Sequence, residues 1–300
     1  MSSRPAINCT VAGKQLHITG RFLKTARLRS EYYVRLEDAS SFVEDVRKSS
    51  IRADILTFIQ DINDRSPKYS FHHEDEQLAV LPITTYDEWF RKQLYNKPRN
   101  TLRKALKSGL EIRLEEFSES LLRGIKGIYD ESPVRQGRRN RHYKKDLETL
   151  KKEHGMFLDR SQFITVYSAG EMIGFAKVTF SQGFGIFMNF LSQISHRDKA
   201  PNNAILAKAV EICADRKLNS LVYGVWGSGG TTGLVEFKLA NGFQCAEVPR
   251  YYVPLTSLGR LALRAGVQGG IVKRIPRGCI EAAANVRKRW NAFRFRSLPV

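Results

Sequence analysis

Hydrophobic residues recur at helical spacing most clearly between Asn202 and Lys217. Leu206, Val210 and Cys213 fall on one side of a helix with 3.6 residues per turn, and charged residues such as Lys208 fall on the other. A stripe of this kind lets a helix bury one face and expose the opposite one. The pattern therefore predicts a long amphipathic helix packed on a larger hydrophobic layer.

Strands are predicted on both sides of this helix. Before it, three segments rich in β-branched and aromatic residues are separated by short turns, and after it come one fully apolar segment and a final strand. The five segments are 162–167, 172–180, 185–191, 221–225 and 247–255. Helices and strands that alternate in this way predict an α/β protein with a mixed sheet.

The chain upstream of these strands is predicted to form helix, strand and helix. Thr85 and Glu88 have the spacing of a capping box, so we expect a helix to begin there. Gly109 stands where a left-handed residue ends a helix, and Ser118 precedes a second amphipathic pattern. Between them, residues 110–114 alternate between apolar and charged, which predicts a half-buried strand.

The first 85 residues have a different pattern. Segments 7–11 and 15–21 predict a hairpin, segments 40–47 and 51–62 have helical spacing, and segments 69–73 and 77–83 predict two strands. We expect a small N-terminal α/β unit over residues 1–85, a larger domain over 86–256 and a basic helical extension over 257–300.

Composition is that of a globular protein with a large excess of cations. Of the 300 residues, 42% are hydrophobic and 26% are charged, which excludes a disordered, collagenous or coiled-coil chain. The formal net charge of +19 predicts attraction to nucleic acid, acidic lipid or phosphorylated substrates. The alternative is charge spread over the surface without a specific partner.

Other features favour a cytoplasmic protein without metal. The N-terminus lacks an apolar signal-peptide run, and the longest uncharged stretches, 178–195 and 218–235, are interrupted by polar residues and glycine. The four cysteines are isolated from one another, and His72 and His73 would point to opposite faces of a strand. We therefore expect no metal site and no membrane-spanning segment.

The order of elements and two short motifs indicate a family. Residues 99–109, Arg-Asn-Thr-Leu-Arg-Lys-Ala-Leu-Lys-Ser-Gly, precede a strand, and Phe237-Lys238 followed by Asn241-Gly242-Phe243 comes after a glycine-rich loop. Together with the topology, these motifs resemble the GNAT acyltransferase superfamily, nearest to Fem-type aminoacyl transferases. The resemblance implies a GNAT-like domain that forms an amide between an activated acyl or aminoacyl donor and an amine. It also implies a lysine near the reacting centre or the substrate phosphate, which here is Lys238.

The turn before the long helix departs from the acetyl-CoA-using members of the superfamily. Residues 195–203 contain no glycine, and Pro201 removes one backbone donor, so acyl-CoA is disfavoured as a cofactor. The resemblance implies instead an aminoacyl-tRNA or another polyanionic acyl donor, and a phosphorylated small-molecule acceptor. Arg197, Lys199 and Asn203 at this turn are candidate phosphate-binding residues, because cations at a helix N-terminus are unfavourable unless an anion lies between them. Lys238 is the candidate that would support the oxyanion.

A second basic segment precedes the strands. Its candidate phosphate-binding residues are Arg135, Arg138, Arg139 and Arg141. Aromatic residues are interleaved with these cations, which suits contacts with phosphates and bases. His142 and Glu131 are candidate general bases, and the sequence does not choose between them. The tail 287–296 repeats the basic and aromatic mixture, which suits RNA or a peripheral contact with an anionic membrane.

Two other functions compete with aminoacyl transfer. One is a non-catalytic protein that binds RNA or another polyanion and retains the fold. The other is an N-acyltransferase that uses acyl-CoA or acyl carrier protein. Convergence of Arg197, Lys199 and Lys238 on one cleft would favour an enzyme over a binding protein.

Overall fold

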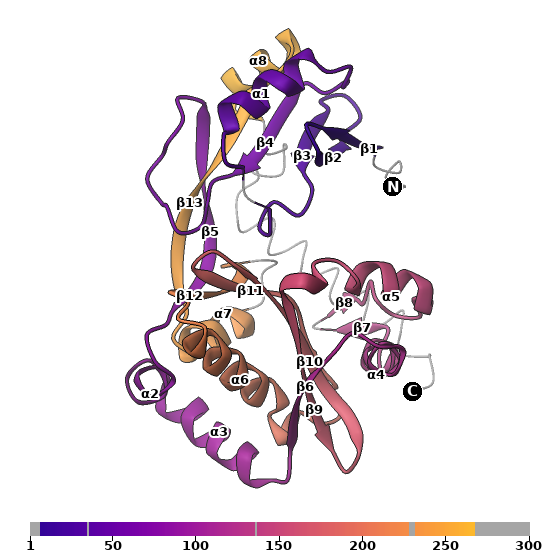
Figure 1. Ribbon diagram of the computed structural model, residues 1–300, viewed down its shortest axis with the longest axis vertical. Coiled ribbons are helices and arrows are strands. Elements are labelled where there is room, and N and C mark those ends of the chain that lie inside the picture. Colours follow the sequence, from indigo (N-terminus) through magenta and orange to yellow (C-terminus); the bar gives the residue numbers. More distant parts are fainter. Residues whose placement is uncertain (1–6, 35, 136, 228–231, 268–300) are drawn as a thin grey trace. The chain divides into compact units, whose positions relative to one another are not determined.

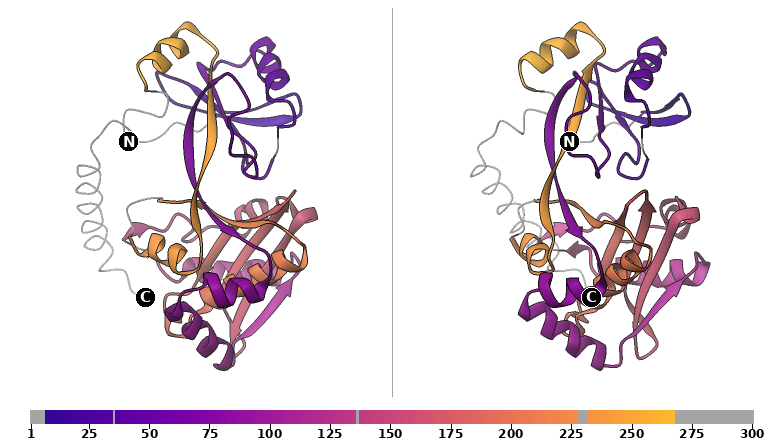
Figure 2. Two further views of the ribbon diagram at one scale, coloured as in Figure 1. Left: turned by 90° about the vertical axis from the view of Figure 1, so that its left-hand side faces the viewer. Right: turned by 60° about the vertical axis from the view of Figure 1, so that its left-hand side comes forward.

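Two long strands, β5 (His72–Pro82) and β13 (Gln244–Pro254), are neighbours in the sheet and run side by side (Figures 1 and 2). The computed structural model describes residues 7–34, 36–135, 137–227 and 232–267. These residues form two units: one comprises the chain up to Gln77 together with the chain from Ala246 onward, and the other comprises Leu78–Cys245. The domain boundaries expected from the sequence stay predictions.

The first unit is built on antiparallel and parallel pairs of short strands. Its strands lie in the order β1, β2, β3, β4 and β13. Their bounds are Ile7–Val11 for β1, Lys14–Thr19 for β2, Thr25–Leu28 for β3 and Ile55–Ile59 for β4, and the helices are α1 (Ala39–Lys48) and α8 (Ser257–Arg264). Phe42, Val43 and Val46 of α1 pack into its core with Leu56 and Phe58.

Two expectations for this unit are wrong. Residues 51–62 do not form a helix, because their central part is β4, and all five of its residues are buried. A strand buried on both faces is nearly continuously apolar, and in β4 only Thr57 interrupts the run, so its residues imitate helical spacing. The two strands expected over 69–83 are one strand, β5, which continues through the acidic residues 74–76. The predicted extension 257–300 begins with α8, and its residues from 268, including 287–296, lie outside the described residues.

The second unit contains a six-stranded mixed sheet in the order β5, β12, β11, β10, β9, β6. The bounds are Ser220–Val225 for β12, Phe184–Ser192 for β11, Glu171–Ser181 for β10, Ser161–Ser168 for β9 and Glu111–Glu115 for β6. Within this sheet the β11–β12 pair is parallel and the other described pairs are antiparallel. A two-stranded ribbon, β7 (Val134–Arg135) and β8 (Arg138–Arg139), lies apart from this sheet.

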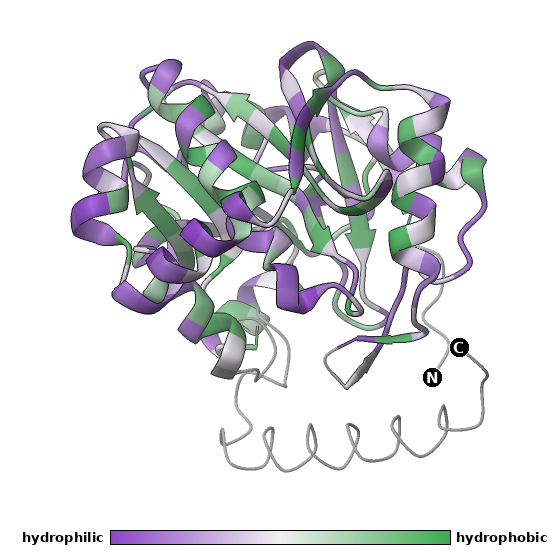
Figure 3. Ribbon diagram, turned by 90° about the horizontal axis from the view of Figure 1, so that it is seen from below, coloured by the Kyte–Doolittle hydropathy of each residue, from purple (hydrophilic) through white to green (hydrophobic). Residues whose placement is uncertain are grey.

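Helices cover both faces of this sheet. On one face α6 (Pro201–Asp215) packs with α3 (Asn96–Lys107), and on the other lie α4 (Glu119–Asp130) and α5 (Leu147–His154) (Figure 1). Alternate residues of β9 explain the two layers, because Ile164 contributes to the α6 core and Phe163 to the α4 core. Hydrophobic residues accordingly concentrate in the strands, and hydrophilic residues mark the outer surfaces of the helices (Figure 3).

The remaining short helices connect these layers. They are α2 (Tyr86–Glu88), η1 (Trp89–Gln93), η2 (Leu158–Arg160), η3 (Arg197–Lys199) and α7 (Thr232–Ala240). The predicted cap is present, since the Glu88 backbone N–H donates to the Thr85 hydroxyl at 3.1 Å. The prediction for α6 is also confirmed, because Leu206, Val210 and Cys213 are fully buried against the sheet. Among the described residues, none of the helices has the length and hydropathy needed to cross a bilayer.

Candidate functional site

The sheet of the second unit opens between β11 and β12. These parallel strands pair only from Phe184 to Ile186 on β11 and from Ser220 to Val222 on β12. Beyond this pairing lies a cavity of about 430 Å³, a size suited to a small ligand or the end of a larger one. Its lining residues come from β7, β11, η3, α6, β12, α7 and the loop after β11: Arg135, Phe190, Leu191, Ser192, Ile194, Arg197, Asn202, Tyr223, Gly233, Leu234 and Phe237.

One side of the cavity is aromatic. The ring of Phe190 lies 5.1 Å from that of Tyr223 and 6.3 Å from that of Phe237, measured between centroids. The Tyr223 and Phe237 rings are 6.5 Å apart and nearly perpendicular. Edge-to-face packing of this kind fixes the rings and presents a stiff apolar wall.

The other side is cationic and is formed by two arginines. Arg135 Nη1 donates to the Ser192 carbonyl at 2.7 Å, and its Nη2 donates to the Ile128 carbonyl at 2.8 Å and to Glu131 at 2.9 Å. Burial lowers the pKa of Arg135, and the nearby charge of Arg197 lowers it further, while Glu131 opposes both. Arg197 is exposed and has no carboxylate partner among the described residues. The cavity therefore has one fixed and one free guanidinium.

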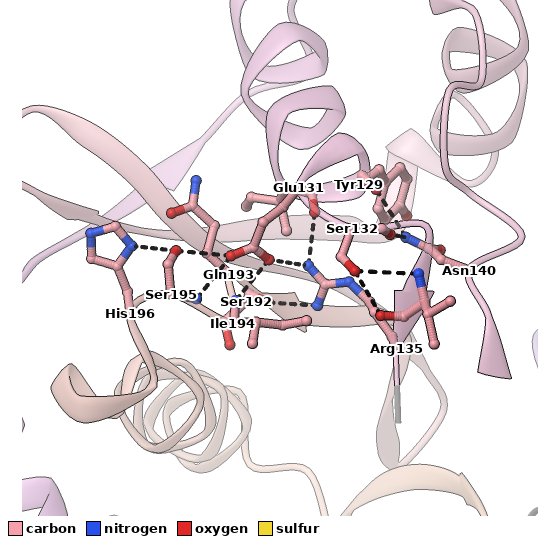
Figure 4. Close-up of polar contacts among 12 residues, drawn as sticks. Tyr129, Glu131, Ser132, Arg135, Asn140, Ser192, Gln193, Ile194, Ser195 and His196 are labelled. Atoms are coloured by element: carbon pink, nitrogen blue, oxygen red, sulfur yellow. Dashed lines mark hydrogen bonds and ion pairs between the residues drawn. The ribbon is translucent and has the colours of Figure 1, made fainter. Parts of the chain in front are cut away.

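Glu131 anchors this arrangement (Figure 4). Its carboxylate accepts hydrogen bonds from the backbone N–H groups of Ile194 and Ser195 at 2.7 and 2.8 Å, and from the Ser195 hydroxyl at 2.8 Å. Burial alone would raise the pKa of Glu131, but these bonds and the charge of Arg135 lower it on balance. A carboxylate held ionised by so many donors is a weak proton acceptor. Its predicted role as a base stays a prediction, and its observed contacts position Arg135.

Ser195 also approaches His196, with Oγ and Nδ1 3.2 Å apart (Figure 4). In this series of hydrogen bonds the hydroxyl of Ser195 lies between the carboxylate of Glu131 and the imidazole of His196. A nucleophilic triad needs the imidazole between the other two groups, so that it can take the hydroxyl proton. The Ser195 hydroxyl instead donates to Glu131, and this group is not arranged as a nucleophile.

Lys238 is buried behind the aromatic wall. Lys238 is only 1% exposed. Its Nζ donates hydrogen bonds to the carbonyls of Val225 at 2.7 Å and Trp226 at 3.2 Å. Nζ also lies 5.0 Å from the centre of the Tyr223 ring, and burial lowers the pKa of Lys238 to about 8. The side chain thereby secures the end of β12 where it has separated from β11. The two carbonyls occupy two of the three N–H donors of the ammonium group.

His142 is not among the lining residues of the cavity. Its ring stacks on Tyr129 with centroids 4.4 Å apart, and its Nδ1 is 3.9 Å from a carboxylate oxygen of Glu153. Burial, with the charges of Lys145 and Arg141, lowers the pKa of His142 to about 4. The imidazole is therefore neutral at pH 7 but weakly basic, and its assignment as a base stays a prediction.

The N-terminus of α6 also reaches the cavity, through Asn202. Ala200 adopts a left-handed conformation with φ of 53°, and it ends η3 and begins α6 without a capping side chain. The Asn202 Oδ1 atom is buried without a hydrogen-bond partner in the described structure. Lys199 does not line the cavity, and its Nζ donates to the Ser168 hydroxyl at 2.7 Å. Asn203 is not a lining residue either.

The predicted candidates are thus only partly brought together. Arg135 and Arg197 line the cavity, Lys238 and Glu131 hold its walls from behind, and the remaining candidates do not line it. Arg139 and Arg141 are exposed, and the side chain of Arg138 lies outside the described part of the structure. Sequence reasoning missed the aromatic wall and Asn202. Aromatic residues at the ends of two neighbouring strands, Phe190 and Tyr223, were the available signal.

The described residues offer no cluster of three or more histidine, cysteine, aspartate or glutamate side chains that could hold a metal ion. The lining of the cavity itself contains cationic, amide, hydroxyl and apolar groups. Such a set suits an anionic ligand that also carries an apolar or aromatic part.

Comparison of the chain with protein-family models and with curated proteins gives no match. Three solved structures resemble it over most of its length. FemX has a TM-score of 0.60 at 12% identity, covering 83% of this chain and 87% of that one. The C-terminal domain of a provisionally assigned lysylphosphatidylglycerol synthetase from Agrobacterium fabrum has a TM-score of 0.55 at 11% identity, covering 88% of each chain. L-PGS from Bacillus licheniformis has a TM-score of 0.54 at 13% identity, covering 86% of this chain and 87% of that one.

At these identities the likeness concerns the fold. The chain has a GNAT-like fold, related to that of FemX and of the lysylphosphatidylglycerol synthetase domain. The fold prediction made from element order and from the two short motifs is therefore confirmed.

Proposed function

We propose that this protein transfers an activated acyl or aminoacyl group to an amine at the cavity between β11 and β12, forming an amide. The observation that carries the proposal is the separation of these two strands, beyond which the aromatic wall, Arg135 and Arg197 line one cavity. The lysylphosphatidylglycerol synthetase of similar fold is named for a lysyl group joined to an anionic phospholipid, which supports an aminoacyl donor and a phosphate-bearing partner.

The residues of the cavity bind different parts of the substrates. The guanidinium of Arg197 is free to pair with a phosphate, and Arg135 is held in place by Glu131 to face the same space. The aromatic wall of Phe190, Tyr223 and Phe237 receives the apolar part of a substrate. We expect aminoacyl-tRNA as donor and a phosphorylated small molecule as acceptor.

The chemical step needs one new bond and one broken bond. The amine nitrogen attacks the carbonyl carbon of the donor ester, the C–O bond to the leaving hydroxyl breaks, and the proton lost by nitrogen ends on that hydroxyl oxygen. The developing oxyanion needs a donor. Lys238 does not line the cavity, and its ammonium group holds the carbonyls of Val225 and Trp226, so we assign it the positioning of the end of β12 beside the reacting centre. We leave the oxyanion donor and the proton acceptor unassigned.

One competing function has specific support. The excess of cations and the free Arg197 would equally serve a protein that binds RNA without catalysis. Lys199 and Lys238 do not join Arg197 in the cavity lining, so the convergence expected of an enzyme is not met. The buried polar atom of Asn202 in the lining still favours an enzyme, because a surface that only tracks phosphates does not need it.

The experiment is to incubate the protein with bulk tRNA carrying radiolabelled amino acids and with a pool of phosphorylated amines. We expect label to move into a small product that resists mild alkali, because amides survive conditions that hydrolyse esters. A parallel incubation with labelled acetyl-CoA tests the other donor. Label that remains on tRNA, or that is released only as free amino acid, would contradict the proposal.

A further inference from the structure

Helix α3 presents a row of cations to solvent. Its residues Pro98, Leu102 and Ala105 are buried, and Leu102 packs in one core with α6, whereas Lys97, Lys104 and Lys107 are exposed. Lys97 and Lys104 are seven residues apart, and Lys107 is three residues further on, so they occupy neighbouring positions on the outer face. Figure 3 shows the molecule from below, with hydrophilic and hydrophobic residues alternating along its helices.

These cations lack local counter-charges. Between Trp89 and Leu110 the sequence contains seven cations and no carboxylate. The first two, Arg91 and Lys92, pair with Asp87 and Glu88 on the preceding turn. Lys97, Lys104 and Lys107 have no carboxylate partner among the described residues, so their charge is available to a ligand.

The position of Lys97 is informative because it stands in the first turn of α3. The positive end of the helix dipole makes a cation unfavourable there, whereas Lys104 and Lys107 in the last turn are favourable. The first turn contains no acidic residue that would offset Lys97. A bound anion along this face would remove the unfavourable contribution.

Aromatic and guanidinium groups adjoin this row. Arg99 and Arg103 lie over the Phe90 ring, at 5.9 and 5.3 Å from its centre, and Tyr95 just before α3 is 60% exposed. Guanidinium groups and exposed rings stack on bases and also accompany phosphate contacts. A helix that binds an anionic lipid surface would instead carry a continuous apolar stripe. Among the described residues, Leu106 is the only large aliphatic side chain of α3 that is exposed.

The row is connected to the cavity through α7. The backbone N–H of Tyr95 donates to the carbonyl of Ala240, the last residue of α7, at 3.0 Å. Leu234 and Phe237 of the same helix line the cavity. Because α7 rises about 1.5 Å per residue, the cavity wall and the start of α3 are on the order of 10 Å apart. One elongated polyanion can therefore reach both.

We propose that the outer face of α3, with Lys97, Lys104 and Lys107, binds the sugar-phosphate backbone of an RNA whose end enters the cavity. This inference rests on the proposed function, since it assigns a binding surface to its tRNA donor. Twelve helical residues extend about 18 Å. A nucleic acid duplex of that length presents about ten phosphates, enough for three lysines to find partners.

The test compares two double variants of equal charge. Lys97→Gln with Lys104→Gln removes two cations of the row, and their opposite effects on the helix dipole nearly cancel. Lys151→Gln with Lys152→Gln removes two exposed cations from α5, on the other face of the sheet, and is the control. Binding of deacylated bulk tRNA is measured over a range of salt concentrations, with circular dichroism to monitor folding.

We expect the slope of log affinity against log salt to fall by about 1.8 in the α3 variant, at roughly 0.9 for each phosphate contact, and to stay unchanged in the control. Equal slopes in both variants would overturn the proposal. The proposal would also be overturned if the α3 variant lost binding to phosphatidylglycerol vesicles but still bound tRNA like the wild-type protein. Deacylated tRNA cannot donate an acyl group, so this binding assay does not depend on transfer. A wild-type protein that binds deacylated tRNA through α3 but transfers nothing from aminoacyl-tRNA would contradict only the proposed function.

Discussion

Arg135 of β7 donates a hydrogen bond of 2.7 Å to the carbonyl oxygen of Ser192, the last residue of β11. The two residues are 57 positions apart in the chain, so this bond ties a short ribbon to the strand that has parted from its neighbour. A carbonyl at a diverging strand end has lost its ladder partner and needs another donor. The guanidinium supplies it and at the same time faces the cavity.

The two arginines of the cavity should respond differently to replacement. Arg135→Met removes the donor to two carbonyls and one of the four hydrogen bonds to Glu131, so we expect the free energy of unfolding to fall by about 2–3 kcal/mol. Arg197→Gln should change stability by less than about 0.5 kcal/mol, because Arg197 is exposed, while transfer falls at least ten-fold. Urea unfolding and initial rates measure the two effects. Equal stability losses would contradict the assigned positions.

The bonds from the Lys238 ammonium to the end of β12 predict a basic limb in the pH profile. Its pKa is lowered to about 8, so the ammonium loses its proton as the pH rises through that value. Single-turnover transfer should then decline above pH 8. Lys238→Met should strongly reduce the transfer rate and abolish its decline above pH 8. Lys238→Arg should not restore the transfer rate in full, since the larger guanidinium group cannot occupy the same buried place. A Lys238→Met variant that keeps the limb would refute the role.

Acid should destabilise the second unit through two histidines. Burial is the main cause that lowers the pKa of both His142 and His154 to about 4, below the ordinary value of 6.5. The unfolded chain therefore binds more protons between pH 6.5 and 4, and stability falls as the pH is lowered through that range. Each histidine contributes a slope of about 1.4 kcal/mol per pH unit.

His142→Phe retains the stacking on Tyr129 and removes one titrating group, so the pH dependence between 6.5 and 4 should become shallower. Urea unfolding at several pH values measures the slope, and wild-type protein at pH 8 is the reference. An unchanged slope would show that His142 is protonated equally in the folded and unfolded chain.

Acetyl-CoA should bind poorly at the N-terminus of α6. The turn 195–203 has no glycine, and Pro201 as the first helical residue offers no N–H to a pyrophosphate. Calorimetric titration should give no saturable signal. Micromolar affinity, about −8 kcal/mol, would show that the side chains of this turn replace the missing backbone donors.

The sequence allowed the prediction of elements that bury one face. In the second half of α6, the charged residues Lys208, Glu211 and Asp215 alternate with buried apolar residues, and this pattern predicted both the helix and its packing. Strand β4 could not be distinguished from a helix, because both of its faces are covered and its one polar residue, Thr57, is buried with the rest and marks no alternation.

The cavity was less accessible to prediction for a related reason. Phe190, Tyr223 and Phe237 come from three separate elements, and nothing local to each residue shows that β11 and β12 separate. Arg197 could be found from its place before a helix, whereas Asn202 attracts notice only once its buried oxygen is seen to lack a partner.

The central claim is that acyl transfer takes place in the cavity between β11 and β12. The most direct measurement is single-turnover transfer from labelled aminoacyl-tRNA by wild-type protein and by a variant with Arg197→Gln and Tyr223→Leu, with Glu236→Gln on the exposed side of α7 as the control. The account predicts a loss of at least a hundred-fold in the cavity variant with its fold intact, and no change in the control. Transfer at the wild-type rate by the cavity variant would place the chemistry elsewhere in the molecule.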